Sequence, residues 1–573
     1  MSTAAEARSY RLRWRHLDKS LFVWVLLIGV LLVLVINPLA RLLWASFQDG
    51  ETGALTLGNY AVAYGRWRYL EALGNSLVLG VAVAALCTVF GVPMAWAVSR
   101  TDMPGKGLVW AAILGTFIMP SYLGAVAWIL LAGPNAGWLN RAWMALTGTA
   151  AGPLDVYTMS GLVLIVACYS FPYMFVFTRS ALDLISSEME EAAATLGAGV
   201  VRTTLRVTLP LTLPAILGAF IVEFLEAIAL FGAPALIALP GRFQVMTTML
   251  WQFFEFPPKV EVAAAYAMPL LVITVVLFWL QRRIIARKGF VALTGKGGER
   301  RPLRLGAWRW PMLGYCLFVT SLSFFLPMLV VLHAAFAKAW GRGVALDNVT
   351  LHNLKFVLFD QSTTQAATIH TFVYGGTAAA FALGLALAIA YIVHRRLVPF
   401  GGTLSYIAMA PFVIPGIVLA IGFYAAYTTR PLVLYGTAWI LILAFTTRFL
   451  PIAYANSDAA IRSVNPELED AVRILGGSRR LAMRRVLAPL LKRGLAGAFI
   501  LVFIPATREL SSAIFLYTTG TQVLSVLLFD KSDEGNFEIL SSIGLILVVI
   551  TVVLVMLGFR LVGRDFMLKR TTA

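Results

Sequence analysis

The residues of this sequence that could most readily take part in chemistry are ionisable side chains within apolar segments. Glu223 and Glu226 stand three residues apart in one apolar run, and Arg508 and Glu509 are adjacent in another. Positions three apart share one face of a helix, and a charge placed within lipid usually faces a cavity or a partner because it is costly there. These four residues are therefore candidates for lining a polar passage. An interhelical ion pair, such as Arg508 with Glu226, is the alternative, and both interpretations remain open.

Other reactive residue types form no catalytic or metal-binding pattern. The cysteines, Cys87, Cys168 and Cys316, lie in separate apolar segments without the spacing of a redox pair or a metal site. The five histidines are scattered and form no HExxH arrangement. The stretch TGKGGER at 294–300 lacks the spacing of a nucleotide-binding P-loop. We therefore expect no catalytic residue, no metal site and no cofactor bound by this chain.

The composition indicates that the elements carrying these residues lie in a membrane. Of 573 residues, 60% are hydrophobic and only 13% are charged. A soluble chain of this size needs more charge to cover its surface. The segment at 21–40 contains no ionisable side chain at all, and about 20 apolar residues suffice to cross the hydrocarbon layer as a helix. The bilayer is therefore the solvent of this chain.

Twelve apolar segments are candidate membrane spans, and a basic stretch at 282–310 divides them into two groups of six. An even number of spans inserts both halves in the same direction, which predicts parallel rather than inverted repeats. The sequence thus predicts an all-α polytopic membrane protein with about 12 transmembrane helices in two six-helix repeats. The predicted spans are 21–43, 75–98, 108–132, 159–179, 212–237, 262–281, 311–335, 371–393, 402–426, 434–456, 494–516 and 540–562.

Lysine and arginine residues gather on one side of the predicted spans. The N-terminal tail is basic, as are the segments at 180–211, 282–310 and 457–493, whereas 516–539 is acidic. By the positive-inside rule, the N-terminus and the basic segments face the cytoplasm. The net charge of +18 then reflects membrane topology, so we expect a lipid bilayer and no nucleic acid as partner. The predicted parts are a cytoplasmic tail at 1–20, a first half at 21–281, a cytoplasmic linker at 282–310, a second half at 311–562 and a cytoplasmic tail at 563–573.

One cytoplasmic segment occurs twice. The sequence EEAAATLGAGVVRTTLRVTLP begins at Glu190, and EDAVRILGGSRRLAMRRVLAP begins at Glu469. A single offset of 279 residues (469 minus 190) aligns the copies without a gap. Each copy predicts a short helix with an acidic start, a glycine turn and a second helix that leads into the next span.

These loops resemble the EAA loop of ABC importer permeases. The first copy matches the pattern of that loop at Glu191, Ala192, Ala193, Gly197, Val207, Leu209 and Pro210. The second copy keeps Ala471, Gly476 and Pro489, but has Asp470, Val472 and Ala488 in place of Glu, Ala and Leu. The whole chain is most similar to fused ferric-iron permeases, which are grouped with thiamine and polyamine relatives.

The resemblance implies a type I importer permease fold in which each loop seats one of two copies of an ATP-binding subunit. The implied docking residues are Glu190, Glu191, Ala192, Ala193, Gly197 and Pro210 in the first loop, and Glu469, Asp470, Ala471, Gly476 and Pro489 in the second. ATP and Mg would bind to the partner subunits, so this chain is expected to be a transport subunit and not an enzyme.

The resemblance also implies a place and a cargo. The chain would lie in the bacterial inner membrane and receive its substrate from a periplasmic binding protein. Ferric iron is the leading cargo, and thiamine, a polyamine, a phosphonate or another small solute is the alternative. A secondary transporter with parallel repeats is the alternative from another class, and the duplicated docking loops weigh against it.

Overall fold

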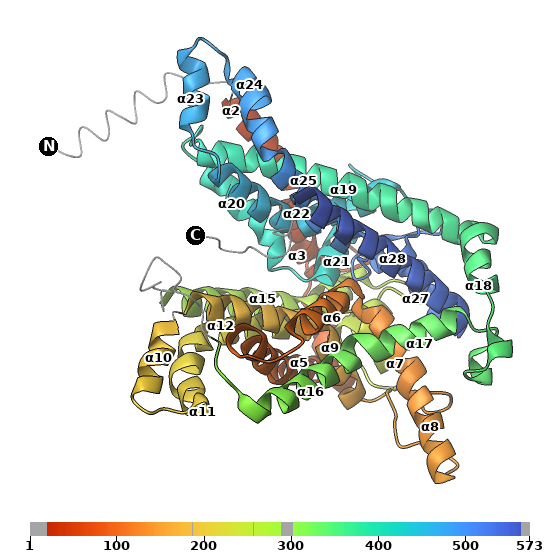
Figure 1. Cartoon of the computed structure of the whole chain (residues 1–573). Helices are drawn as coiled ribbons and strands as arrows, with labels where there is room; N and C mark the ends of the chain where they lie inside the picture. The colour runs from red at the N-terminus through yellow and green to blue at the C-terminus, as the bar shows by residue number, and fades with distance from the viewer. Residues whose placement is uncertain (1–19, 186, 256, 288–301, 563–573) are drawn as a thin grey trace. The chain divides into compact units, whose positions relative to one another are not determined.

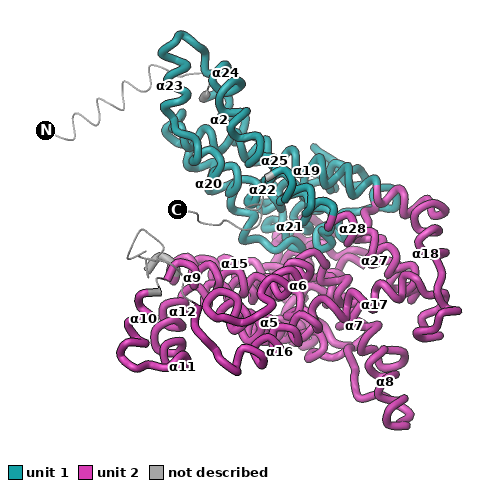
Figure 2. The backbone as a smooth tube through the Cα atoms, in the orientation of Figure 1, with its two compact units in different colours: residues 1–45, 369–521, 553–570 teal, residues 46–368, 522–552, 571–573 magenta. Residues whose placement is uncertain are grey.

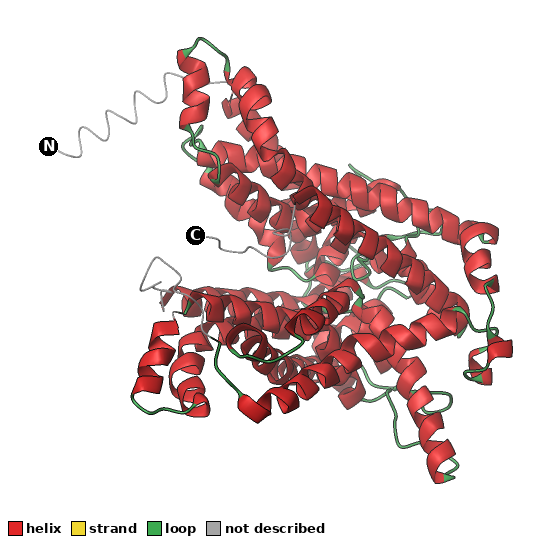
Figure 3. Cartoon of the chain, viewed as in Figure 1, coloured by secondary structure: helices red, strands yellow, loops and turns green. Residues whose placement is uncertain are grey.

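The computed structural model describes residues 20–185, 187–255, 257–287 and 302–562. The described chain is helical, with turns and loops between the helices (Figure 3). The predicted tails, except for Ser20, and residues 288–301 of the predicted linker lie outside the described residues.

The helices, labelled in Figure 1, lie at the predicted spans. Those up to the linker are α2 (Ser20–Leu31), η1 (Leu32–Ile36), α3 (Asn37–Ser46), α4 (Gly58–Gly65), α5 (Trp67–Arg100), α6 (Lys106–Ile118), α7 (Ser121–Ala132), α8 (Trp138–Thr147), α9 (Met159–Leu184), α10 (Ser187–Thr195), α11 (Val200–Thr203), η2 (Thr204–Thr208), α12 (Leu209–Ala229), α13 (Gly232–Ala238), α14 (Met246–Gln252) and α15 (Val260–Arg287). Those after it are η3 (Gly306–Trp308), α16 (Arg309–Thr320), η4 (Ser321–Phe325), α17 (Leu326–Ala335), η5 (Trp340–Arg342), η6 (Leu346–Asn348), α18 (His352–Lys355), η7 (Phe356–Asp360), α19 (Ser362–His394), α20 (Gly402–Met409), η8 (Ala410–Phe412), α21 (Gly416–Tyr427), α22 (Ala438–Arg462), α23 (Glu467–Ile474), α24 (Arg479–Ala482), η9 (Met483–Leu487), α25 (Ala488–Thr507), α26 (Ala513–Leu516), α27 (Leu524–Asp533) and α28 (Phe537–Val562).

Ten helices in the described ranges are long and apolar enough to cross a membrane, and two bent helix pairs raise the number to twelve if each is one span. The predicted all-α polytopic fold is confirmed. The bent pairs are α6 with α7, at 104°, and α20–η8 with α21, at 110°. The helices after the bends begin directly after Pro120 and Pro415. Proline disfavours helical backbone in the residue before it, and Met119 is extended, with ψ 120°.

The fifth and eleventh spans differ from their predicted bounds of 212–237 and 494–516. The fifth is one helix over Val200–Ala229 and the eleventh one over Arg479–Thr507. Both begin earlier because the second helix of each duplicated loop continues into the membrane without a break. The fifth span ends earlier because Leu230 has extended backbone, with ψ 133°.

The chain packs as two compact units that do not follow the order of the sequence (Figure 2). Among the described residues, unit 1 contains 20–45, 369–521 and 553–562, and unit 2 contains the described parts of 46–368 together with 522–552. Unit 1 therefore joins the first span to helices of the second half. Unit 2 joins α16 and α17, the first span of the second half, to α6 and α7 of the first half.

Hydrogen bonds and close packing against its backbone hold the first span within unit 1. The hydroxyl of Tyr427 in α21 donates to the carbonyl of Val33, and Thr447 Oγ1 in α22 donates to the carbonyl of Leu34 at 3.2 Å. A Cβ at Gly422 would lie 2.7 Å from the carbonyl oxygen of Pro38, so only glycine permits this close approach. The first span is therefore an integral part of unit 1.

The first span of each half ends at a carbonyl that accepts a hydrogen bond from an asparagine side chain. Asn59 Nδ2 in α4 donates to the carbonyls of Ser46 and Gln48, at 3.2 and 2.8 Å. Asn353 Nδ2 in α18 donates to the carbonyls of Ala335 and Ala337, at 3.2 and 2.7 Å. Both asparagines are buried, and each satisfies carbonyls that a helix end leaves without an intrahelical donor.

We expect Asn353→Ala to destabilise the protein by about 1–3 kcal/mol, because the buried carbonyl of Ala337 loses its side-chain donor. The carbonyl of Ala335 loses one donor and keeps Ser542 Oγ at 3.3 Å. Thermal unfolding of the purified chain in detergent measures the destabilisation. Asn135→Ala, at an exposed asparagine between α7 and α8, is the matched control and should unfold at nearly the wild-type temperature. An equal shift for both variants would contradict the capping role.

Candidate functional site

The duplicated loops have the same backbone. The helices α11 and α24, and the segments η2 and η9 that follow them, are related residue for residue by the 279-residue offset. Helices α10 and α23 end together at Thr195 and Ile474, also 279 apart. The predicted order of short helix, glycine turn and second helix is present in both copies.

A glycine ends the first helix of each loop in a left-handed conformation. Gly197 and Gly476 both have φ +80°, a value that side chains with a Cβ rarely adopt. The amide of Ala198 donates to the carbonyl of Ala193 at 3.0 Å, and the amide of Gly477 donates to that of Val472 at 2.8 Å. These bonds form a Schellman ending. The two predicted glycines thus fix the direction in which each loop reverses.

The acidic pair at the start of each loop separates into a buried and an exposed residue. Glu190 and Glu469 are buried. Glu191 and Asp470, the next residues, are exposed together with Ala192 and Ala471. The exposed acids are available to a partner, whereas the buried acids are not.

Each buried acid is paired with an arginine from a distant helix. Arg100 Nη1, at the end of α5, lies 3.4 Å from Glu190 Oε2. Arg395 Nη2, directly after α19, lies 2.6 Å from Glu469 Oε1. No pattern in the sequence pairs either arginine with its loop.

A leucine before each turn glycine projects from the loop. Leu196 is 89% exposed and Leu475 is 88% exposed, and they are related by the same offset. Single exposed leucines are common on protein surfaces, but the repetition of this one at equivalent places in both loops makes the pair candidates for contact with a partner. The sequence contained a signal for them, an apolar residue before the glycine in both copies, but they were not among the predicted docking residues.

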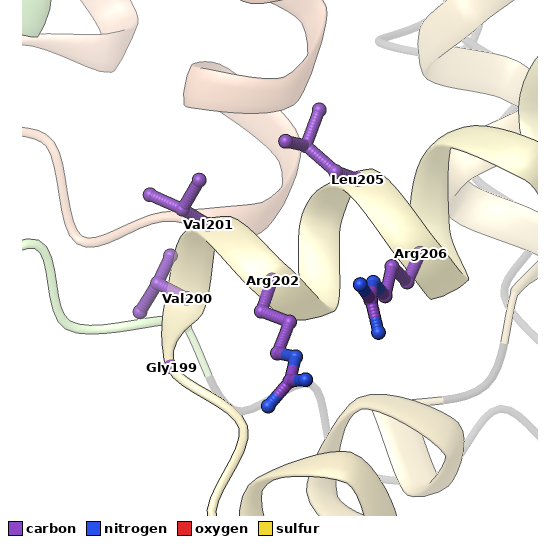
Figure 4. Close-up of a pocket in the computed structure, with 6 residues that line it drawn as sticks. All are labelled: Gly199, Val200, Val201, Arg202, Leu205 and Arg206. Atoms are coloured by element: carbon purple, nitrogen blue, oxygen red, sulfur yellow. The ribbon is translucent and has the colours of Figure 1, made fainter.

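The second helix of the first loop borders an open groove of about 540 Å³ (Figure 4). Its lining combines apolar side chains with two guanidinium groups. Figure 4 shows Val201 and Leu205 on one side of the helix and Arg202 and Arg206 on another. The lining residues are Gly199, Val200, Val201, Arg202, Leu205 and Arg206.

The same surface of the second loop is more basic. At the 279-residue offset, Val201 and Leu205 are replaced by Arg480 and Arg484, which are both exposed. The loops therefore share a backbone and a projecting leucine but differ in the charge of the helix behind them.

Pro210 and Pro489 stand in the first turn of α12 and α25. A proline there is tolerated at a helix start because its missing N–H has no intrahelical acceptor to lose. Here the helix already runs continuously from the preceding π-helical segment. The wide turns at η2 and η9 accommodate the prolines inside one long span.

The intramembrane acids of the first half have different surroundings. Glu223 is fully buried in unit 2, and its Oε1 accepts the amide of Met174 at 3.1 Å, two residues after the helix-interior Pro172 of α9. Glu226 is exposed on the isolated chain. Glu223 therefore contacts the backbone of α9 near a proline, and a direct role of either acid in translocation stays a prediction.

The intramembrane charges of the second half stand at the end of α25. Arg508 follows the helix directly, and Glu509 Oε1 accepts the amide of Ser512 at 2.9 Å. Arg508 belongs to unit 1 and Glu226 to unit 2, so their pairing also stays a prediction.

A further intramembrane cation was missed. Arg448 in α22 donates through Nη1 to the carbonyl of Ile414 at 2.8 Å, next to the bend before α21. A Cβ at Gly416 would lie 3.4 Å from both Arg448 Nε and Glu509 Oε1, so these two charges flank the start of α21. Arg448 was detectable from sequence as a lone arginine within the predicted span 434–456.

The described residues contain no group of three or more His, Cys, Asp or Glu side chains arranged to hold a metal ion. The cysteines are buried and unbonded to one another.

Comparison with known proteins assigns the family. The model of the family "Binding-protein-dependent transport system inner membrane component" matches residues 88–289 and 387–564. These two matches cover more than half of the chain, and each contains one duplicated loop. The chain belongs to this family. It is a multi-pass inner-membrane permease of an ABC importer, as the EAA-like loops implied.

Two relatives align with most of this permease, and a third aligns with less than half of it. The ferric transport system permease protein FbpB of Actinobacillus pleuropneumoniae is 26% identical over 95% of this chain and 78% of its own length. The putative ferric transport system permease protein FbpB 1 of Haemophilus influenzae is 27% identical over 89% of this chain and 80% of its own length. A putative 2-aminoethylphosphonate transport system permease protein PhnV of Salmonella paratyphi A is 27% identical over 41% of this chain and 87% of its own length. The phosphonate relative therefore aligns with less than half of this chain.

Proposed function

We propose that the permease receives two copies of a separate ATP-binding subunit, one on α10 and one on α23. The observation that carries this proposal is the repeated loop, with its left-handed glycine, exposed acid and exposed leucine at matching positions. Closure of the ATP-bound pair would draw the two loops together and open the passage to the outer side. ATP and Mg would remain on the partner subunits.

The distribution of positive charge supports a cytoplasmic location for both loops and for the N-terminus. Arg202, Arg206, Arg480 and Arg484 follow the two turns, and positively charged loops remain on the cytoplasmic side. A periplasmic binding protein would then dock on the opposite side, where the acidic segment 516–539 lies. The family description, which names binding-protein-dependent transport, supports this partner.

We propose ferric iron, delivered by that binding protein, as the cargo. The relatives that align with 95% and 89% of the chain are named as ferric transport permeases, whereas the phosphonate relative aligns with 41%. Ferric iron prefers hard oxygen ligands, which a binding protein can supply before the ion enters the passage. Thiamine, polyamines and phosphonates remain the alternatives to exclude.

Cells that express the permease with its ATP-binding subunit and binding protein should accumulate radioactive ⁵⁵Fe against its concentration gradient, because ATP hydrolysis drives import, whereas cells that lack the permease should not. Uptake is measured in a strain without its own ferric importer. Unlabelled ferric iron should compete, whereas thiamine, putrescine and 2-aminoethylphosphonate should not. Competition by one of these solutes without iron uptake would reassign the cargo and leave the docking proposal intact.

A further inference from the structure

The geometry points to Arg100 and Arg395 as positioning residues that transmit movement of the docking loops to the second span of each half. The inference rests on the proposed function, because it assumes that ATP-binding subunits move these loops. Its basis is an ion pair that occurs in both copies and joins a loop to a helix far away in sequence.

The buried acids face inward. Glu190 and Glu469 have 3% and 7% of their surface exposed, although each stands beside an exposed acid on a short surface helix. A carboxylate is buried in this way only when a cation or several donors stabilise it. These acids therefore contact the permease itself and leave Glu191 and Asp470 for the partner.

Each arginine holds the buried carboxylate and a backbone carbonyl at the start of the loop, and Arg100 Nη2 donates to the carbonyl of Leu182 as well. Arg100 Nη2 donates to the carbonyl of Ile185 at 2.7 Å, while its Nη1 faces Glu190. Arg395 Nη2 donates to the carbonyl of Val464 at 3.4 Å, while its Nε donates to Glu469 Oε1 at 2.7 Å. Ile185 and Val464 are themselves 279 residues apart. A guanidinium presents several donors in a fixed plane, so each arginine holds the start of the loop and its first helix together.

The two ion pairs form although their arginines are not related by the 279-residue offset that relates the loops. Arg100 and Arg395 are 295 residues apart, whereas the acids are 279 apart. The chain between arginine and acid therefore differs in length between the halves, yet the same contact closes in both. A chance contact of surface charges would not reproduce the acid, the arginine and the backbone carbonyl together.

The second acid, Glu469, is held by more groups from its span than the first acid, Glu190. Tyr391 in α19 donates to Glu469 Oε2 at 2.8 Å, so two groups from the end of α19 hold this acid. The first acid instead accepts Thr208 Oγ1 at 2.7 Å from the following helix. Leu487 takes the place of Thr208 in the second loop. Movement of α23 should therefore pass to α19 more directly than movement of α10 passes to α5.

The arginines lie at the ends of long spans, which lets a small shift of the loop act along a whole helix. Arg100 is the last residue of α5, which packs against α9 and α12. Those two helices flank the first loop on either side. A loop held to three spans at once moves them together, whereas a loop attached only by its own flanking spans can tilt alone.

The test uses the reconstituted complex of permease, ATP-binding subunits and ⁵⁵Fe-loaded binding protein in proteoliposomes. The variants are Arg395→Gln, Glu469→Gln and the double variant, with Arg396→Gln as matched control because this neighbouring arginine is exposed. We expect each single variant to keep the ATP-binding subunits but to move at least about tenfold less iron per ATP hydrolysed. The double variant should fall no further than the singles, because residues acting as one unit are not additive.

Arg395→Lys keeps the positive charge and should recover part of the transport per ATP. Wild-type transport per ATP in the Arg395→Gln and Glu469→Gln complexes would overturn the inference. Equal losses in Arg396→Gln would overturn it as well, since a general effect of charge would then explain the result.

Failure of the proposed function would give results different from failure of this inference. If the wild-type permease retains no ATP-binding subunit, the docking proposal fails before any variant is compared. If the wild-type complex hydrolyses ATP on addition of its binding protein but moves no iron, only the cargo is wrong. Coupling is then measured as the stimulation of hydrolysis by the binding protein, which Arg395→Gln should lower and Arg396→Gln should not.

Discussion

Replacing both projecting leucines, Leu196→Asp with Leu475→Asp, should abolish retention of the ATP-binding subunit during purification. Each leucine is the most exposed apolar side chain of its loop, and a docked partner would bury it. Losing a central apolar anchor of an interface costs about 2 kcal/mol or more, or about 30-fold in affinity. A buried aspartate without a partner adds to this loss.

The measurement is the dissociation constant of the ATP-binding subunit from detergent-solubilised permease. Each single variant should lose one of the two binding events and keep the other, because the loops are separate sites. Leu346→Asp is the matched control, since Leu346 is 96% exposed in η6, outside both loops. Unchanged affinity in the double variant, or an equal loss with Leu346→Asp, would exclude the leucines from the docking surface.

Changing both turn glycines to valine should weaken docking through the backbone alone. At Gly197 and Gly476, φ is +80°, and an added Cβ would meet no atom within 4 Å. The change therefore strains the backbone without a clash. A left-handed residue with a Cβ costs about 1–2 kcal/mol, and a β-branched valine suits this region least. We expect the loop to leave its Schellman ending and the affinity for the ATP-binding subunit to fall at least about tenfold.

Gly535→Val provides the control for this experiment. Gly535 has φ +71° and also has open space around its Cβ position, but it lies between α27 and α28, outside both loops. The control should show similar strain with normal docking. Asparagine tolerates left-handed backbone, so Gly197→Asn with Gly476→Asn should dock better than the valine variant. If valine and asparagine variants bind like the wild type, the turn conformation is unimportant for docking.

The parts of the fold that depend on short stretches of sequence were predictable. Apolar length located the ten long helices and the two bent helix pairs of the described residues, because a run of apolar residues is a local property of the sequence. The glycine turns were predictable for the same reason. Gly197 and Gly476 follow a helical segment at a fixed distance and have the expected left-handed backbone.

The parts that depend on packing between distant segments were not predictable. Arg100 lies 90 residues from Glu190, and Arg395 lies 74 residues from Glu469. No local pattern links them, and the repeat offset that aligned the loops does not align the arginines. The exchange of the first spans between the halves was missed for a similar reason. Hydropathy shows that residues 21–43 cross the membrane but does not show which helices they contact.

The intramembrane charges were only partly predictable. Their cost in lipid identified Glu223 and Arg508 as unusual, but the sequence did not separate packing from transport. The bond from Met174 to Glu223 gives that acid a packing role within unit 2. Arg448 has the same kind of cost, and a search of every predicted span for lone charges would have found it.

Native mass spectrometry of the permease, co-expressed with its ATP-binding subunit and extracted in detergent, tests the central claim most directly. The two matching loops predict one permease chain with two ATP-binding subunits. They also predict one subunit in the Leu475→Asp variant and none in the double leucine variant. A wild-type complex with no ATP-binding subunit, or one that keeps both subunits when both leucines are replaced, would contradict docking on the duplicated loops.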